Sequence, residues 1–118
     1  MQITIKRVYE SASSDDGVRI LVDRLWPRGL SKDRAKIDHW FREVAPSNEL
    51  RRWFNHEPPK WDEFRRRYSA ELDQEDVAVR SVWDEASRCK VTLLFAAKDE
   101  ERNNAVALRE YLVQLNLS

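Results

Sequence analysis

The segment 22–30, Val-Asp-Arg-Leu-Trp-Pro-Arg-Gly-Leu, gathers residue types that can recognise a ligand. It follows an apolar run, and Pro27 and Gly29 then interrupt the pattern. Its charged and aromatic side chains are those of Asp23, Arg24, Trp26 and Arg28. Arginine binds carboxylate or phosphate through paired hydrogen bonds, and an indole ring can stack on a guanidinium. This chemistry indicates recognition of an anion and does not define a reaction.

Two other positions carry polar residues that suit the same task. Ser47 opens a predicted helix, and Lys98 and Asp99 follow a predicted buried strand and precede another helix. Helix N-termini favour anions, and ligands of open α/β sheets bind beyond the carboxyl ends of the strands. We therefore expect one pocket for a small phosphate- or carboxylate-bearing ligand. The candidate ligand-binding residues are Asp23, Arg24, Trp26, Arg28, Ser47, Lys98 and Asp99.

The same side chains also fit a purely structural role. Asp23 could pair with Arg24 or Arg28 and fasten the turn, while Lys98 and Asp99 could cap the last helix. The residue types alone do not decide between a pocket and a scaffold.

The remaining reactive residues form no familiar catalytic or metal-binding pattern. His39, His56 and Cys89 are widely spaced, which does not match the spacing of metal ligands. A histidine before two prolines, as at His56, is more typical of a helix end than of a general base. Only two glycines are present, so there is no glycine-rich phosphate loop. We expect neither a metal nor a cofactor, and the sequence leaves open whether the protein is an enzyme.

Length and charge narrow the class of protein. A chain of 118 residues is expected to form a single domain over 1–118. Its 21 basic and 21 acidic residues balance, whereas proteins dedicated to binding duplex nucleic acid carry a basic excess. The single cysteine and the lack of a long apolar stretch predict a cytosolic protein that does not bind membranes. The oligomeric state is not predicted.

Four segments have β-strand patterns. Residues 2–9 alternate apolar and polar, 18–25 are more continuously apolar, and 91–97 are nearly all apolar, as in a strand covered on both faces. Residues 37–45 fit a helix or a strand, and the following Pro46 favours the strand. The loop between the first two strands is short, so we expect antiparallel neighbours or strands that do not pair directly.

The helical segments complete the fold class. A short capped turn is expected at 31–36, and longer helices are expected from Ser47, over about 60–72, over about 76–88 and over about 103–115. Together the patterns predict an α/β domain with a small mixed sheet of three to four strands covered by about four helices.

Trp26 supports a second interpretation of the 22–30 segment. Unlike the other four tryptophans, it does not fall on a predicted apolar face, and it lies between Arg24 and Arg28. The turn could therefore serve a protein- or RNA-interaction module. A pocket of ligand size would favour the small anion, whereas a flat exposed patch holding Trp26 and Arg28 would favour the module.

Several stretches resemble the YeaO-like branch of the domain of unknown function 488. They are 21–32, 45–54, Trp61 to Tyr68, 92–99 and 103–105. The resemblance covers nearly the whole chain. It implies a small cytosolic bacterial or archaeal α/β domain and brings no activity with it.

One departure from the wider family bears on catalysis. Longer members of that family carry Cys and Glu at the end of the central strand and Cys-His-Arg at the next helix. This chain has Phe95 and Ala97 at the first place and Asn103, Asn104 and Ala105 at the second. The thiol and imidazole groups are missing, which favours binding over catalysis.

Overall fold

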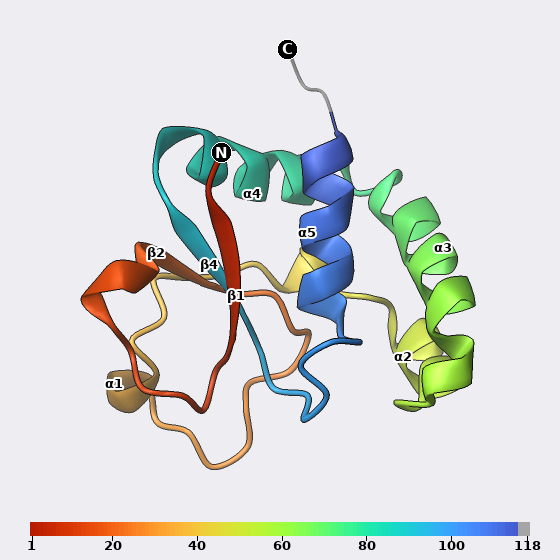
Figure 1. Cartoon of the computed structure of the whole chain (residues 1–118), viewed down its shortest axis with the longest axis horizontal. Coiled ribbons are helices and arrows are strands. Elements are labelled where there is room, and N and C mark those ends of the chain that lie inside the picture. The colour runs from red at the N-terminus through yellow and green to blue at the C-terminus, as the bar shows by residue number, and fades with distance from the viewer. Residues whose placement is uncertain (116–118) are drawn as a thin grey trace.

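The computed structural model describes residues 1–115 of the chain (Figure 1). The strands are β1 (Ile3–Arg7), β2 (Val18–Leu21), β3 (His39–Trp40) and β4 (Val91–Phe95). The α-helices are α1 (Lys32–Ala35), α2 (Asn48–Phe54), α3 (Trp61–Leu72), α4 (Asp76–Arg88) and α5 (Asn104–Gln114). Short 3-10 turns lie at Ser14–Asp16, Arg42–Val44 and Pro58–Lys60.

The four strands form one sheet in the order β1-β4-β2-β3. Every neighbouring pair is parallel, and Val91 of β4 lies opposite both Ile3 of β1 and Val18 of β2. The predicted α/β class and strand number are confirmed, but the sheet is wholly parallel and not mixed. Parallel strands bring their carboxyl ends to one edge, where ligands of such sheets bind.

The last strand, β4, lies between the first two strands in the sheet. β1 and β2 do not pair directly, in agreement with one of the two alternatives left open. Residues 8–17 cross over β4, starting where the Val8 N–H donates to the Phe95 carbonyl (2.8 Å) and ending where the Val18 N–H donates to the Lys90 carbonyl (3.0 Å). The connection contains the 3-10 turn Ser14–Asp16 and no α-helix.

The ambiguous segment 37–45 contains both kinds of structure. Only His39–Trp40 is strand, and the 3-10 turn Arg42–Val44 follows it. The strand is a short edge, held to β2 by the Phe41 N–H donating to the Leu21 carbonyl (3.1 Å). The predicted strand is therefore correct for its centre and too long at both ends.

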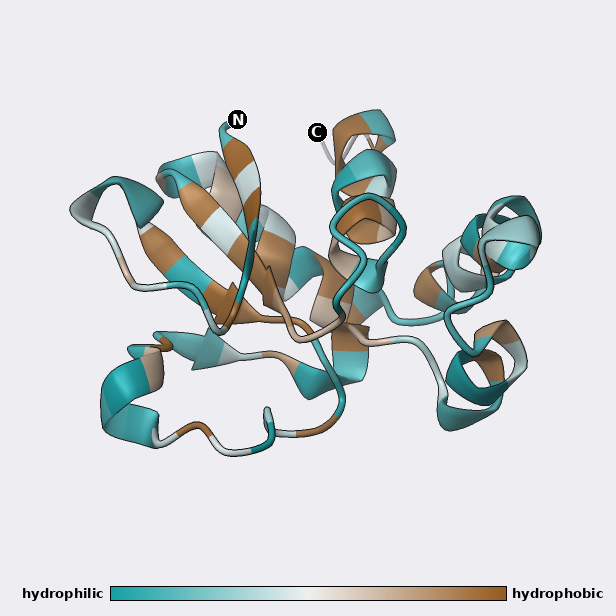
Figure 2. Ribbon diagram, turned by 60° about the horizontal axis from the view of Figure 1, so that its bottom comes forward, coloured by the Kyte–Doolittle hydropathy of each residue, from teal (hydrophilic) through white to brown (hydrophobic). Residues whose placement is uncertain are grey.

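The two faces of the sheet have different covers. Side chains alternate along a strand, so Val91, Leu93 and Phe95 face one way, and they pack with buried residues of α2, α3, α4 and α5. Leu94 faces the other way and packs with Leu21 and with the loop that follows β2. Figure 1 shows α5 between the sheet and α3, and Figure 2 shows hydrophobic bands alternating along the strands. At the carboxyl edge, the loops that follow β2 and β4 lie beside the end of α2 and the start of α5.

A buried ion cluster fastens the loop-covered face. Asp16 pairs with Lys6 (3.1 Å) and Arg19 (2.6 Å), and Arg19 also donates to the carbonyl of Ala35 at the end of α1 (2.8 Å). Burial raises the pKa of Asp16, but hydrogen bonds from the Ser13 N–H, Lys6 and Arg19 outweigh it, so the pKa lies below its usual value of 3.8. The cluster anchors α1 beneath the sheet.

The long helices lie where the apolar spacing predicted them. α4 spans the predicted 76–88, and Ser31 caps α1 by accepting from the Arg34 N–H (3.2 Å). Among the described residues, none of these helices is long and apolar enough to cross a membrane.

Candidate functional site

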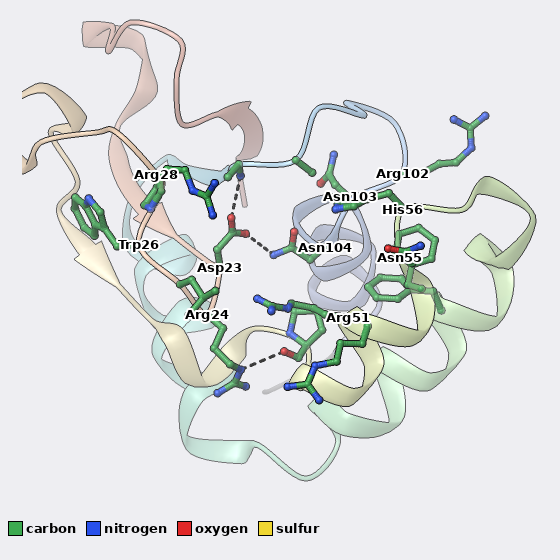
Figure 3. Close-up of a pocket in the computed structure, with 18 of the residues that line it drawn as sticks. Asp23, Arg24, Trp26, Arg28, Arg51, Asn55, His56, Arg102, Asn103 and Asn104 are labelled. Atoms are coloured by element: carbon green, nitrogen blue, oxygen red, sulfur yellow. Dashed lines mark hydrogen bonds between the residues drawn. The ribbon is translucent and has the colours of Figure 1, made fainter.

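An open pocket of about 610 Å³ lies at the carboxyl edge of the sheet (Figure 3). The loop after β2, the C-terminal part of α2 with its following turn, and the segment between β4 and α5 supply most of its lining. The polar lining residues are Asp23, Arg24, Arg28, Arg51, Arg52, Asn55, His56, Arg102, Asn103 and Asn104. We call this cavity the arginine pocket.

Asp23 lies at the centre of the pocket and joins three chain segments. One carboxylate oxygen accepts from the Ala96 N–H just beyond β4 (2.9 Å), and the other accepts from the Asn104 side chain at the start of α5 (2.9 Å). The amide of Asn104 also donates to the Val22 carbonyl (3.0 Å). Asp23 directly follows the buried end of β2, so the strand delivers its carboxylate to the sheet edge.

The charge of Asp23 is only partly compensated. Burial raises the pKa of its carboxyl above the usual 3.8. The hydrogen bonds from Asn104 and the Ala96 N–H, and the charges of Arg51 and His56, lower the pKa but do not cancel the effect of burial. An additional hydrogen-bond donor in the pocket would therefore stabilise the carboxylate.

Arg24 turns away from the pocket centre and serves the scaffold. Its guanidinium donates to the carbonyls of Pro46 (3.2 Å) and Ala45 (3.1 Å) just before α2. Figure 3 shows the guanidinium of Arg24 pointing away from the Asp23 carboxylate. The pairing of Asp23 with Arg24 or Arg28, the structural alternative, is absent among the described residues, and Arg24 secures the chain entering α2.

Three other arginines in the lining are free for an external ligand. The guanidinium groups of Arg28, Arg51 and Arg52 make no hydrogen bond or ion pair with any residue in 1–115. Arg28 is exposed in the turn before Gly29, and Arg51 is close enough to Asp23 to lower its pKa. Five arginines but only one carboxylate, Asp23, line the pocket, so its lining is electropositive.

The turn after α2 holds His56 in a strained backbone conformation. Asn55 and His56 have φ of 47° and 54°, in the left-handed region that costs an L residue roughly 1–2 kcal/mol. Asn55 ends α2 by donating its N–H to the Arg51 carbonyl (3.0 Å). The imidazole of His56 lies 6.3 Å from the ring of Phe54, and both residues line the pocket.

Ser47 lies outside the arginine pocket. Its hydroxyl accepts from the Leu50 N–H (3.1 Å) and donates to the carboxylate of Glu71 (2.6 Å), so it caps α2 and links it to α3. It lines a separate cavity of about 270 Å³, to which Arg24 also contributes. The structure thus gives Ser47 the predicted cap but places the N-terminus of α2 away from the pocket.

Trp26 lines the pocket, yet its indole is held by internal contacts. The indole N–H donates to the Leu30 carbonyl (2.6 Å), and the ring packs edge-on against Trp40 with centroids 5.5 Å apart. Trp26 therefore belongs to the hydrophobic cluster beneath the sheet and supports the loop that carries Arg28.

Lys98 and Asp99 do not line the arginine pocket. Lys98 is exposed, and Asp99 accepts from the backbone N–H groups of Glu101 (2.9 Å) and Arg102 (3.1 Å). These bonds lower the pKa of Asp99 below 3.8, and its carboxylate pairs with the Arg102 guanidinium (3.2 Å). Asp99 thus orders the turn before α5, and Arg102 reaches the pocket already paired.

Of the residues that the sequence suggested, Asp23, Arg24, Trp26 and Arg28 line this pocket, but most of the lining from α2 and α5 was missed. The signal for Asn103 and Asn104 was present, because they follow the central strand. The contribution of Arg51, Arg52 and His56 depends on the direction of α2, which no local pattern encodes. Within residues 1–115, no group of three His, Cys, Asp or Glu side chains could hold a metal ion.

The fold and the site define a small parallel α/β domain with an arginine-lined pocket at the carboxyl edge of its sheet. Residues 2–117 match the family model described as the inactive DUF488-N3 subclade. The chain therefore belongs to the domain of unknown function 488 family, as its motifs predicted.

Its relatives are themselves uncharacterised. The chain is 44% identical over 115 residues to the uncharacterized protein YeaO of Escherichia coli K12, covering 98% of this chain and 100% of that protein. It is 40% identical over 111 residues to the uncharacterized protein Rv3073c of Mycobacterium tuberculosis H37Rv, covering 94% of this chain and 93% of the relative. No solved structure matches the chain significantly.

Proposed function

We propose that this domain binds a small anionic ligand, one that bears a phosphate or a carboxylate, in the arginine pocket. The observation that carries the proposal is the uneven charge of the lining, which holds five arginines, two of them with internal partners, and one carboxylate, in a chain whose total charge is zero. Arg28, Arg51 and Arg52 have no carboxylate partner among the described residues, so their charge is available to a ligand.

The position and size of the pocket support the same function. Ligands of parallel α/β sheets bind beyond the carboxyl ends of the strands, where this pocket lies. Its volume of about 610 Å³ falls within the range typical of small-molecule sites. The indole of Trp26 is occupied by Leu30 and Trp40, which favours a small ligand over a base-stacking RNA surface.

The proposed role is binding without chemistry. The family model that matches the chain is described as an inactive subclade. The chain has Phe95 and Ala97, and then Asn103, Asn104 and Ala105, where longer members of the wider family carry thiol, carboxylate and imidazole groups. The polar groups at these places build the pocket, and Asn104 holds Asp23 in position.

Calorimetric titration of the purified protein with inorganic phosphate and with citrate, at low salt, tests the proposal. Arg28→Gln and Arg51→Gln should each weaken binding by about tenfold or more, the effect of losing a charged hydrogen bond. Arg66→Gln, on the exposed face of α3, is the matched control and should leave the affinity unchanged. Absence of binding to the wild type, or equal affinities in all three variants, would contradict the proposal.

A further inference from the structure

The arginine pocket has two chemically different zones. Its centre presents oxygen acceptors, from Asp23 and Asn104, while Arg28, Arg51 and Arg52 supply cationic donors from the loop after β2 and from α2. A bare anion would satisfy only the donors. A ligand that fits the whole pocket needs an anionic group and a hydrogen-bond donor in one molecule.

The orientation of the Asn104 amide is fixed by its neighbours. Its nitrogen donates both hydrogens, one to the Val22 carbonyl (3.0 Å) and one to Asp23 (2.9 Å). The reverse orientation would place the amide oxygen against two acceptors, so the network excludes it. The oxygen of Asn104 is left as an acceptor without a partner among the described residues, and Figure 3 shows it turned away from Asp23.

Asp23 also has unused capacity to accept. An ionised carboxylate has about four lone-pair sites, whereas each oxygen of Asp23 accepts one hydrogen bond. Burial raises the pKa of this carboxyl above 3.8 despite those bonds, so a further donor would favour its charged form. A donor supplied by the ligand would be charge-assisted and therefore strong.

The cationic zone suits a phosphate ester better than a carboxylate. One guanidinium fork saturates the two oxygens of a carboxylate, but a phosphate monoester has three terminal oxygens and can accept from several forks. Arg28 approaches from one segment and Arg51 and Arg52 from another, an arrangement that matches several oxygens. The pocket volume of about 610 Å³ also leaves room for an organic group beyond the phosphate.

We propose that the ligand is a small phosphate ester with a free hydroxyl group, such as a polyol or sugar phosphate. The phosphate binds Arg28 and Arg51, and the hydroxyl donates to Asp23. A hydroxyl is favoured over an ammonium group as the donor because the pocket lining already carries an excess of positive charge. This inference rests on the proposed anion-binding function and adds the second group that the ligand must carry.

A pair of ligands that differ by one hydroxyl tests the inference on the wild-type protein. We expect 2-hydroxyethyl phosphate to bind about tenfold or more tightly than ethyl phosphate, as measured by calorimetry or NMR titration under identical conditions. In the Asp23→Asn variant, whose folding is checked by its melting curve, this discrimination should fall to about two- to threefold or less. Ethyl phosphate should still bind that variant.

The outcomes separate the two proposals. Failure of both phosphates and of inorganic phosphate to bind would overturn anion binding itself. Equal affinities for the two esters would overturn the hydroxyl inference and leave anion binding intact. Tighter binding of 2-aminoethyl phosphate than of 2-hydroxyethyl phosphate would show that the donor is an ammonium group, and it would overturn the inference that the ligand donates a hydroxyl. Because the ligand pair needs no substitution, an unstable variant would not prevent the test.

Discussion

Arg24 and Arg28, four positions apart in the sequence, have different roles in the structure. Arg24 is half-buried and donates to the carbonyls of Ala45 and Pro46, whereas Arg28 is exposed and its guanidinium has no partner among the described residues. The motif predicted that both would contribute to a pocket, and both line it. It could not predict the division of roles, because the partners of Arg24 are carbonyls more than twenty residues away.

Removing the guanidinium should separate these roles in a stability measurement. Arg24→Met should lower the free energy of unfolding by about 1–3 kcal/mol, because two partly buried carbonyls lose their charged donor. Arg28→Met should change it by less than about 0.5 kcal/mol, as is usual for exposed residues. Urea denaturation followed by tryptophan fluorescence measures both, and a larger loss in Arg28→Met would show that Arg28 is structural.

Asp23 should make the protein less stable as pH rises, whereas a salt-bridged carboxylate makes a protein more stable as pH rises. Its pKa is raised by burial, so between 3.8 and the folded pKa the folded state holds more protons than the unfolded state. Over that window stability falls as pH rises. The stability of the wild type minus that of Asp23→Asn should therefore decrease as pH rises above 3.8.

Subtracting the stability of Asp23→Asn from that of the wild type removes the contribution of other titrating groups, including Asp16, whose pKa is lowered. Urea unfolding at a series of pH values gives the difference directly. If the difference grew with pH, Asp23 would be a fully compensated carboxylate, and its role as an acceptor for a ligand hydroxyl would lose its support.

For helices and strands, the local sequence pattern predicted their positions in the chain well, but it did not predict how they are arranged in space. The apolar spacing of residues 76–88 predicted α4 to the residue, and the apolar run from Val91 predicted the central strand. The parallel insertion of β4 between β1 and β2 could not be predicted, since strand order depends on contacts distant in the chain. The position of the pocket depends on that order and on the direction of α2.

Gly17 marks the close approach that the inserted strand requires. It has φ of 67°, and a Cβ there would lie 2.2 Å from the Lys90 carbonyl oxygen, just before β4. Gly17→Ala should destabilise the fold by more than about 3 kcal/mol, because backbone strain adds to a steric clash with main chain. Thermal and urea unfolding measure the loss.

Gly29 is the matched control for this substitution. Its φ is 76°, but no atom lies within 4 Å of a Cβ built there. Gly29→Ala should cost only the strain of the left-handed backbone, about 1–2 kcal/mol. Equal losses in the two variants would mean that the Lys90 contact does not restrict Gly17 and that β2 and β4 are less tightly packed at this end.

At the scale of the whole molecule, the balanced charge conceals an uneven distribution. The counts of basic and acidic residues correctly showed no overall excess, but five arginines and only one carboxylate line the arginine pocket. Many other charges pair along the helices, as Arg67 does with Glu63 on α3 (2.8 Å). Total charge therefore argues against a broad nucleic-acid surface and does not argue against a local anion site.

The most direct test of the account is an NMR titration that follows the Nε–H groups of the arginine side chains. On addition of 2-hydroxyethyl phosphate, the signals of Arg28 and Arg51 should shift together with saturation, as should the backbone amides of Ala96 and Asn104 beside Asp23. Arg66, on the far face of α3, should not shift. Shifts confined to Arg66 and other helix-surface arginines, or no saturable shift at low salt, would contradict the claim that the carboxyl edge of this sheet binds an anion.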